Sequence, residues 1–181
     1  MNTVAPSFTW NSRAGFTAET KTAVFTAWWD DYATEILRLC YCYFGNRADA
    51  EDALQEIFLK AWHTMDRFEA RNHSQTKSWL LKITIHTCRD ALRKPWHRKN
   101  NHSIDRNELA SMKAASREDC ALLLNIFMLP RKYKEVILLH YYQNMPVREI
   151  AKMLHNSKRV ISRRITKACK LLKQVEEGES K

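Results

Sequence analysis

The sequence predicts an all-α protein made of two small helical domains joined by a flexible linker. Apolar residues recur at three- and four-residue steps over most of the chain, which is the period of an amphipathic helix. Only 3 Gly and 4 Pro occur in 181 residues, and this scarcity disfavours a turn-rich β fold. A hydrophilic stretch over residues 100–116 divides the chain into two parts, each long enough for a small core.

The predicted organisation has five parts. They are a flexible N-terminal tail (1–22), a first helical domain (23–99), the linker (100–116), a second helical domain (117–175) and a C-terminal tail (176–181). The linker is assigned because it contains Ser, Asn, Lys and acids and has little apolar material to bury. Fully extended, it would reach roughly 50 Å at about 3.3 Å per residue, enough for the two domains to bind separate sites.

Three helices are expected in the first domain, over residues 23–44, 48–68 and 77–93. The apolar stripe of the first consists of Phe25, Trp28, Trp29, Tyr32, Ile36, Leu39, Cys40 and Tyr43. Gly45 ends this helix, and Asp49 is a natural N-cap for the second. Ser74 or Thr76 can cap the third helix, which stops ahead of Pro95 because proline disfavours helical backbone at the residue before it. The short connection after the first helix predicts an antiparallel hairpin.

The helix expected over residues 48–68 has two distinct faces. Its apolar stripe, which belongs in a core, consists of Ala50, Ala53, Leu54, Ile57, Phe58, Ala61, Trp62 and Met65. The opposite face carries Asp52, Gln55, Glu56, Leu59 and His63. Residues 48–59 hold four acids and no Lys or Arg on a chain of formal charge +10, which indicates a protein partner at this face. The alternative is a solvated face whose acids only favour the positive end of the helix dipole.

A basic stripe follows the helix expected over residues 77–93. Its members recur at steps of four, three and four: Lys82, His86, Arg89 and Arg93. The cluster continues in Lys94, Trp96, His97, Arg98 and Lys99. A stripe this regular can follow a phosphate backbone, and an aromatic ring among cations suits stacking on unpaired bases. The alternative is again a solvated, cationic face.

The second domain is expected to end in a helix-turn-helix. Apolar spacing predicts helices over residues 122–127, 131–142, 147–154 and 158–172. The bend before the last helix has no glycine, so His155 would need left-handed backbone or a different bend. Outward residues of the last helix are Lys158, Arg159, Ser162, Arg163, Thr166, Lys167 and Lys170. Because the N-terminal half of such a helix meets base edges, Arg159, Ser162 and Arg163 are candidates for base reading, and the later cations for phosphate contacts.

Composition narrows the partners and the chemistry. With 30 Lys+Arg against 20 Asp+Glu, the expected partner is a polyanion, either nucleic acid or an acidic membrane surface. No apolar run approaches the ~20 residues that cross a bilayer and no leader pattern occurs, so we expect a cytoplasmic protein without membrane insertion of its own. The five cysteines are expected as reduced thiols, and the Cys40-x-Cys42 spacing makes a poor zinc clip. No catalytic motif is present, which predicts a protein that is not an enzyme and has no cofactor or metal.

Three blocks of sequence carry a family resemblance. They are DAEDALQEIFLKAW (49–62), SWLLKITIHTCRDALR (78–93) and LPRKYKEVILLHYYQNMPVREIAKML (129–154). In order and spacing they resemble the bacterial RNA polymerase sigma factors of the sigma-70 family, in the extracytoplasmic-function (ECF) subgroup. The resemblance covers about residues 24–98 and 117–174. It implies that the first domain corresponds to sigma region 2 and the second to sigma region 4.

This resemblance implies a role for each candidate surface. The helix over residues 48–68 would dock on the clamp coiled coil of the largest polymerase subunit through Asp52, Gln55, Glu56 and Leu59. The promoter −10 element would be contacted by Asn72, His73, Ser74, Lys82, His86, Arg89 and Arg93, and the loop that also includes Gln75 would receive bases turned out of the melted duplex. The −35 element would be contacted by Lys158, Arg159, Ser162, Arg163 and Lys167. One departure is His86, where the family commonly has Asn; a histidine still donates to a base edge.

The partners implied are core RNA polymerase, promoter DNA and an anti-sigma factor that restrains the free protein. Two alternatives make different predictions. A helix-turn-helix repressor or activator would bind duplex DNA as a dimer, tightly and without polymerase. A helical adaptor would dock a protein through the acidic face of residues 48–68, and its DNA binding would not depend on Arg159 or Arg163.

Overall fold

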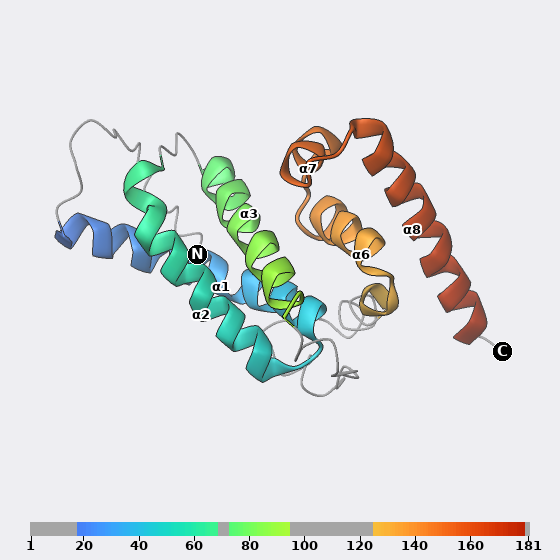
Figure 1. Ribbon diagram of the computed structural model, residues 1–181, viewed down its shortest axis with the longest axis horizontal. Coiled ribbons are helices and arrows are strands. Elements are labelled where there is room, and N and C mark those ends of the chain that lie inside the picture. Colours follow the sequence, from blue (N-terminus) through green and yellow to red (C-terminus); the bar gives the residue numbers. More distant parts are fainter. Residues whose placement is uncertain (1–17, 69–72, 95–124, 180–181) are drawn as a thin grey trace, which may run out of the picture. The chain divides into compact units, whose positions relative to one another are not determined.

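The structure is a computed structural model that describes residues 18–68, 73–94 and 125–179, the last five by their backbone alone (Figure 1). Within these residues all regular structure is helical, as the sequence predicts. The chain divides into two compact units, Met1–Cys40 with Ala48–Asn101, and Tyr41–Arg47 with His102–Lys181. The expected linker, Asn72, the cluster after Lys94 and the first half of the helix expected at 122–127 lie outside the described residues.

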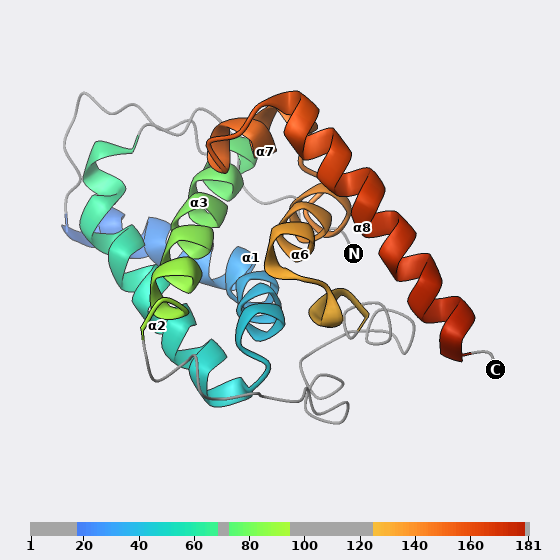
Figure 2. The ribbon, with the colours of Figure 1, turned by 45° about the vertical axis from the view of Figure 1, so that its right-hand side comes forward.

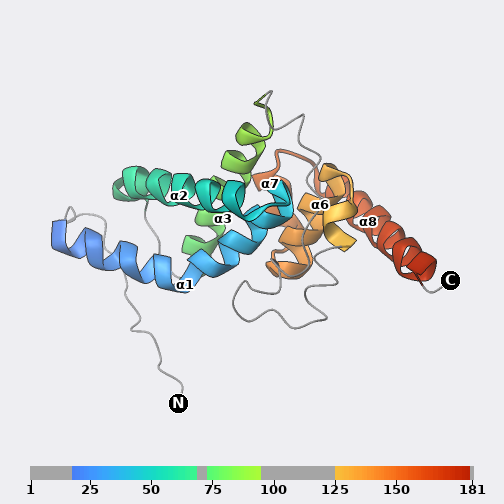
Figure 3. The same cartoon turned by 90° about the horizontal axis from the view of Figure 1, so that it is seen from below.

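The first unit is built on three helices. Helix α1 spans Ala18–Phe44, α2 spans Arg47–Thr64 and continues as the short 3-10 helix η1 (Met65–Arg67), and α3 spans His73–Ala91. Gly45 makes the turn between α1 and α2 with φ of 77°, a left-handed backbone that glycine adopts without strain. Figure 3 shows α1 and α2 alongside each other, and Figure 2 shows α3 against this pair.

Aromatic rings and small side chains fill the space between these helices. The Phe58 ring of α2 packs against Phe25 and Trp29 of α1, with ring centroids 5.8 and 4.7 Å apart. Trp28 of α1 meets Trp79 of α3 at 5.5 Å. The stripe predicted for α2 is buried as expected at Ala50, Ala53, Leu54, Ile57, Phe58, Ala61 and Met65. Trp29, expected to face inward, is 40 % exposed because one face of its ring covers Phe58 and the rest meets solvent.

Helices α1 and α2 both begin earlier than the sequence predicts. Helix α1 starts at Ala18 rather than 23, and the ammonium of Lys21 in its first turn binds Asp66 at 2.6 Å and lies 4.7 Å from the Trp62 ring centroid. This contact joins residues far apart in sequence and holds a turn that local pattern leaves unassigned. Helix α2 starts at Arg47, so Asp49 is in its first turn and is not the N-cap.

Helix α3 begins at His73 rather than 77, which corrects the expected loop and caps. Ser74 and Thr76 therefore lie inside the helix, and Thr76 is buried. The first turn is held against α1 because the Tyr32 hydroxyl contacts His73 Nδ1 at 2.8 Å and the Lys77 ammonium binds Glu35 at 2.9 Å. Tertiary contacts thus extend this helix beyond its predicted start.

The described part of the second unit includes α6 (Arg131–Ile137), the π-helix η2 (Leu138–Tyr142), α7 (Val147–Met153) and α8 (Lys158–Glu179). Residues 125–128 are also helical. Helix α6 packs on α8, and α7 packs on both α8 and η2. The helix predicted over 131–142 changes to π geometry at Leu138, and α8 continues beyond its predicted end at 172. Buried side chains from every element form the core, among them Ile126, Val136, Leu139, Ile150, Ile161 and Ala168.

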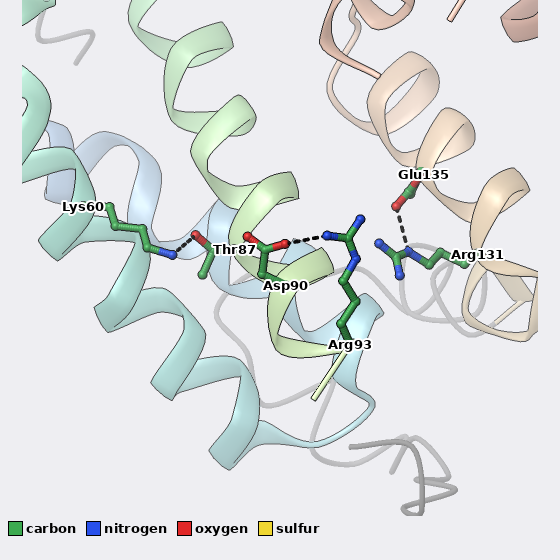
Figure 4. Close-up of polar contacts among 6 residues, drawn as sticks. All are labelled: Lys60, Thr87, Asp90, Arg93, Arg131 and Glu135. Carbon is green, nitrogen blue, oxygen red and sulfur yellow. Dashed lines mark hydrogen bonds and ion pairs between the residues drawn. The ribbon is translucent and has the colours of Figure 1, made fainter. Parts of the chain in front are cut away.

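A buried lysine lies in this core. The Lys134 side chain is 8 % exposed, its ammonium lies 4.1 Å from the Phe127 ring centroid, and it donates to the Cys42 carbonyl of the same unit at 3.0 Å. Cys42 is in the last turn of α1, where carbonyls lack partners within the helix. Desolvation lowers the pKa of Lys134 to about 8, although Cys42 and Glu135 partly oppose the shift. The buried carboxylate of Glu135 accepts from Arg131 at 3.1 Å (Figure 4).

Candidate functional site

The α2 face predicted to bind a protein is exposed along its whole length. Asp52, Gln55, Glu56 and Leu59 all lie on the surface, and the Leu59 side chain is 58 % exposed. Large apolar side chains on a surface are informative when polar groups surround them, because water solvates them poorly. The exposed face of α2 therefore combines the polar side chains of two acids and an amide with one apolar side chain, Leu59, that a partner could bury.

Glu56 does not stand alone on this face. Its carboxylate pairs with the ammonium of Lys60 at 2.6 Å, one helical turn later. The same ammonium donates to the hydroxyl of Thr87 on α3 at 3.0 Å (Figure 4). Lys60 comes directly after residues 48–59, which contain four acids and no Lys or Arg. The four-residue spacing of Glu56 and Lys60 predicts their ion pair, whereas the hydrogen bond from Lys60 to α3 cannot be predicted from the sequence. The structure thus connects the acidic face to the neighbouring helix through one lysine.

The basic stripe on α3 is only partly exposed. Lys82 and Arg93 lie on the surface, whereas His86 and Arg89 are half-buried and interact with other groups of the protein. The Arg93 guanidinium binds Asp90 at 3.3 Å, and both side chains are well exposed (Figure 4). Such an exposed pair is worth about 0–1 kcal/mol and is easily exchanged for a phosphate. The stripe that the sequence predicts as evenly exposed therefore has exposed side chains at its two ends, Lys82 and Arg93, and half-buried ones in its middle.

The expected base-receiving residues do not form a loop where the structure describes them. His73, Ser74 and Gln75 lie exposed in the first turn of α3. The His73 side chain is held, because its Nδ1 lies 2.8 Å from the Tyr32 hydroxyl and its ring lies 5.0 Å from the Tyr32 ring. This contact was not predicted, because the apolar pattern assigned Tyr32 only to a core stripe.

The helix-turn-helix is present in the second unit. Pro146 precedes α7, and its carbonyl accepts from Glu149 and Ile150 at 2.9 and 3.1 Å. His155 has φ of 52°, so of the two geometries left open for this bend it takes the left-handed backbone, and the side-chain amide of Asn156 donates to the Leu154 carbonyl at 2.7 Å. Ser157 then caps α8, accepting from the Val160 N–H at 3.3 Å.

The predicted outward face of α8 is exposed. Ile161, Ile165 and Ala168 are buried against the unit. The opposite face presents Lys158, Arg159, Ser162, Arg163, Lys167 and Lys170 to solvent. No acid occurs between residues 158 and 175, so the positive charge of this face is unopposed along the helix itself. A cationic helix face of this kind attracts a polyanion.

The described residues contain neither a metal-binding cluster nor a membrane-spanning helix. Across residues 18–68, 73–94 and 125–179, no three His, Cys, Asp or Glu side chains are grouped so that they could hold a metal ion. In the same ranges no helix has the length and apolarity to cross a membrane. Cys40, Cys42, Cys88 and Cys169 form no disulfide, and the first three are buried.

Comparison with known families identifies the two units. The model for sigma-70 region 2 matches residues 28–98, and the model for sigma-70 region 4 matches residues 120–172, in the order that the family has. The ECF RNA polymerase sigma factor SigW of Bacillus subtilis is 30 % identical over 145 residues, which cover 70 % of this chain and 74 % of SigW. The chain belongs to the ECF subgroup of the sigma-70 family.

Other comparisons agree with this assignment. RNA polymerase sigma factor SigV of Bacillus subtilis is 29 % identical over 143 residues, which cover 79 % of this sigma factor and 85 % of SigV. The fold is similar to that of RpoE, solved with the anti-sigma factor NepR from Bartonella quintana (TM-score 0.69, 18 % identity, 89 % of this chain and 98 % of that one). It is also similar to CnrH, solved with the cytosolic domain of CnrY (TM-score 0.63, 21 % identity, 87 % and 90 %).

The family membership settles the class of function. The sigma factor is a regulator of transcription that binds core RNA polymerase and promoter DNA and directs promoter-specific initiation. This excludes the lone repressor and the adaptor as descriptions of the whole chain, because each would account for one of its two regions only.

Proposed function

We propose that the sigma factor uses three separate surfaces to bind polymerase, the −10 element and the −35 element. The exposed α2 face docks on the clamp coiled coil of the largest polymerase subunit through Asp52, Gln55, Glu56 and Leu59. The surface of α3 contacts the −10 element, and the outer face of α8 contacts the −35 element. The observation that carries this proposal is the opposite charge of two exposed helix faces. The face of α2 presents acids and a leucine, whereas the outer face of α8 presents cations and no acid.

On α8 the division between base reading and phosphate contact follows from position. Arg159, Ser162 and Arg163 lie in the N-terminal half, which enters the major groove in helix-turn-helix proteins. An arginine there is suited to guanine, whose O6 and N7 accept both guanidinium donors. Lys158 and Lys167 supply point charges for phosphates, whose contacts position the helix without reading sequence.

On α3 we assign His73 and Ser74 to unpaired −10 bases, together with Asn72, which lies outside the described residues, and we assign Lys82, His86, Arg89 and Arg93 to the strand beside them. The promoter duplex would then melt because its unpaired bases are bound by the sigma factor. Unstacking a base costs a few kcal/mol, and contacts to the extruded base offset this cost. The sigma factor supplies binding and no catalysis, so the chemistry is that of the polymerase. It acts in the cytoplasm, where polymerase and promoter are found.

We also infer that an anti-sigma factor binds this protein. The support is the fold similarity to RpoE, whose structure contains the anti-sigma factor NepR. The exposed α2 face suits this partner as well, because one protein covering it would block docking on polymerase.

Run-off transcription from a genomic fragment library tests the proposal directly. Purified core polymerase with this sigma factor is expected to start at defined sites. Arg163→Ala should use these sites about 5- to 150-fold less well while still binding core, as expected for a loss of about 1–3 kcal/mol. Lys132→Ala is the matched control, since Lys132 is an exposed cation of the same unit that lies on α6 and not on α8. Undiminished use of the start sites by Arg163→Ala, or an equal loss in Lys132→Ala, would contradict the assignment of α8.

A further inference from the structure

Two cysteine thiols from different helices meet in the core of the first unit. Cys40 lies close to the end of α1 and Cys88 lies in the last turn of α3, 48 positions apart in the sequence. Cys88 Sγ donates to Cys40 Sγ at 3.8 Å, and both residues are fully buried. None of the proposed contacts with polymerase or promoter DNA uses these thiols. They are therefore a pair of potential nucleophiles that the proposed function leaves unused.

The separation of the two sulfur atoms is close to what a disulfide bond needs. In a disulfide the sulfur atoms lie about 2.05 Å apart, so those of Cys40 and Cys88 have to approach each other by less than about 2 Å. Each sulfur is carried by one rotatable bond, Cα–Cβ, and rotation about this bond moves the sulfur while the helix stays in place. A bond between the two would therefore join α1 to α3 without a large change in either helix.

Cys42, two residues after Cys40, does not compete for this bond. Successive residues of an α-helix are rotated by about 100° around its axis, so the side chains of Cys40 and Cys42 leave α1 in different directions. Burial raises the pKa of the Cys42 thiol to about 12, and the Lys134 ammonium only partly opposes this shift. Cys42 therefore keeps its proton, and a protonated thiol reacts poorly because the thiolate is the nucleophile.

The position of Cys88 at a helix end gives an oxidant a route to the pair. A buried sulfur is reached only when the structure opens locally, and the last turn of a helix opens at a lower free energy than its middle. The turn that carries Cys88 is followed by Leu92, which is half-buried, and by Arg93 and Lys94, which are exposed. Cys40, in contrast, is followed within α1 by residues 41–44, which are all buried. We therefore expect Cys88 to react first.

We propose that a hydroperoxide oxidises this pair to a disulfide that ties the end of α3 to α1. In the opened turn the Cys88 thiolate attacks the peroxide, so that an S–O bond forms and the O–O bond breaks. The leaving hydroxide takes up the proton that the thiol lost, which gives water and a Cys88 sulfenic acid. When the turn closes, the Cys40 sulfur attacks the Cys88 sulfur, the S–O bond breaks, and the second hydroxide leaves as water with the Cys40 proton. The two thiols lose two electrons in total, the peroxide gains them, and a thiol reductant reverses the bond.

The first test identifies the bond in the full-length wild type. The reduced protein is treated with hydrogen peroxide, its remaining thiols are alkylated, and its tryptic peptides are mapped by mass spectrometry without reduction. We expect a cross-link between the peptides 39–47 and 83–89 that a thiol reductant cleaves. Because Cys40 and Cys42 share the first peptide, its fragment ions and the variant Cys42→Ser, which should still form the cross-link, assign the bond to Cys40. Recovery of Cys40 and Cys88 in alkylated form, or a bond assigned to Cys42, overturns the proposal.

The second test asks whether the bond forms within the folded protein. The oxidised wild type should unfold at a higher temperature than the reduced wild type, because a cross-link between residues 40 and 88 restricts the unfolded chain. Peroxide should not raise the unfolding temperature of Cys40→Ser. Cys169→Ser, which changes a half-buried thiol of the second unit, should respond as the wild type does. An unfolding temperature that stays the same or falls when the cross-link forms overturns the proposal.

The third test concerns the order of the two steps. A reagent that labels sulfenic acids, present during peroxide treatment, should label Cys88 in Cys40→Ser and leave Cys40 unlabelled in Cys88→Ser. Each variant is first shown to unfold cooperatively under reducing conditions, and the cross-link in the wild type tests the pair independently of both variants. Labelling of Cys40 but not of Cys88 overturns the assignment of Cys88 as the residue that reacts with peroxide.

Discussion

Leu59→Ala is expected to weaken association with core polymerase more than any single change of charge on the α2 face. Full burial of a leucine side chain is worth about 1.5–3 kcal/mol relative to leaving it in water. Leu59 is 58 % exposed in the free protein, so docking has roughly that fraction left to bury, or about 1–1.7 kcal/mol. The expected loss is about 5- to 20-fold in Kd.

Glu56→Ala provides the contrast, because the carboxylate already has a partner. Docking would exchange the Lys60 ammonium, 2.6 Å away, for a cation of the polymerase. Exposed pairs are worth about 0–1 kcal/mol, and an exchange of one for another is worth less than either. We therefore expect Glu56→Ala to change the Kd by less than about 3-fold at moderate salt.

The assay is an equilibrium titration of labelled, full-length sigma factor with core polymerase. Thermal unfolding should be unchanged in Leu59→Ala, because the side chain is largely in water before docking. Met128→Ala is the matched control: Met128 is an apolar side chain, 74 % exposed, in the second unit. Wild-type affinity in Leu59→Ala, or a greater loss in Glu56→Ala, would refute the reasoning that buried apolar area and not charge dominates this contact.

Three further predictions concern the second unit. Arg163→Ala should weaken binding to the correct promoter by about 1–3 kcal/mol and relax the sequence preference. Lys167→Ala should weaken binding to all sequences alike and lower the salt dependence of binding. An equal loss of sequence preference in both variants would contradict the assignment of Arg163 to a base and Lys167 to a phosphate. Lys134→Met should alter the pH dependence of the free energy of unfolding. The pKa of Lys134 is about 8 in the folded state, against an ordinary value of 10.5, so the unfolded chain binds the extra proton, and the free energy of unfolding of the wild type should rise by about 2–3 kcal/mol relative to the variant from about pH 7 to pH 10. The same pH dependence in both proteins would be inconsistent with a buried ammonium. Ser157→Ala should cost about 1 kcal/mol in thermal or urea unfolding through loss of the α8 cap, with Ser157→Thr as a control that retains the hydroxyl.

Features that depend on local sequence were predictable. The buried stripe of α2 follows from apolar residues at helical spacing, because one face of a surface helix must meet a core. The position of the bend at His155 follows from the patterns of the two flanking helices, whereas its left-handed backbone was one of two geometries that the sequence left open. The exposed face of α8 was predicted by the same helical spacing, because its polar residues lie opposite its apolar ones.

Features that depend on contacts between distant residues were not predictable. The early starts of α1 and α3 rest on Lys21 with Asp66 and on Tyr32 with His73, pairs separated by 45 and 41 positions. A period of 3.6 residues says which face of a helix is apolar but not which helix lies opposite. For this reason the base-receiving residues were expected in a loop, and His73 lies instead in a helical turn held from outside.

The magnitude of the Lys60 contacts also limits how docking and DNA binding are coupled. Lys60 is the described link from the α2 face to α3, through Glu56 at 2.6 Å and Thr87 at 3.0 Å. Its side chain is 44 % exposed, so drawing Glu56 away changes the free energy of the α3 contact by at most about 1 kcal/mol. Coupling of that size alters promoter affinity by about 5-fold or less, well below what a switch from an unpopulated to a populated state requires. On the proposed assignment of α2 to polymerase and α3 to the −10 element, polymerase would favour promoter binding along this path chiefly by bringing α3 to the DNA, because the Lys60 contacts are too weak to require a rearrangement.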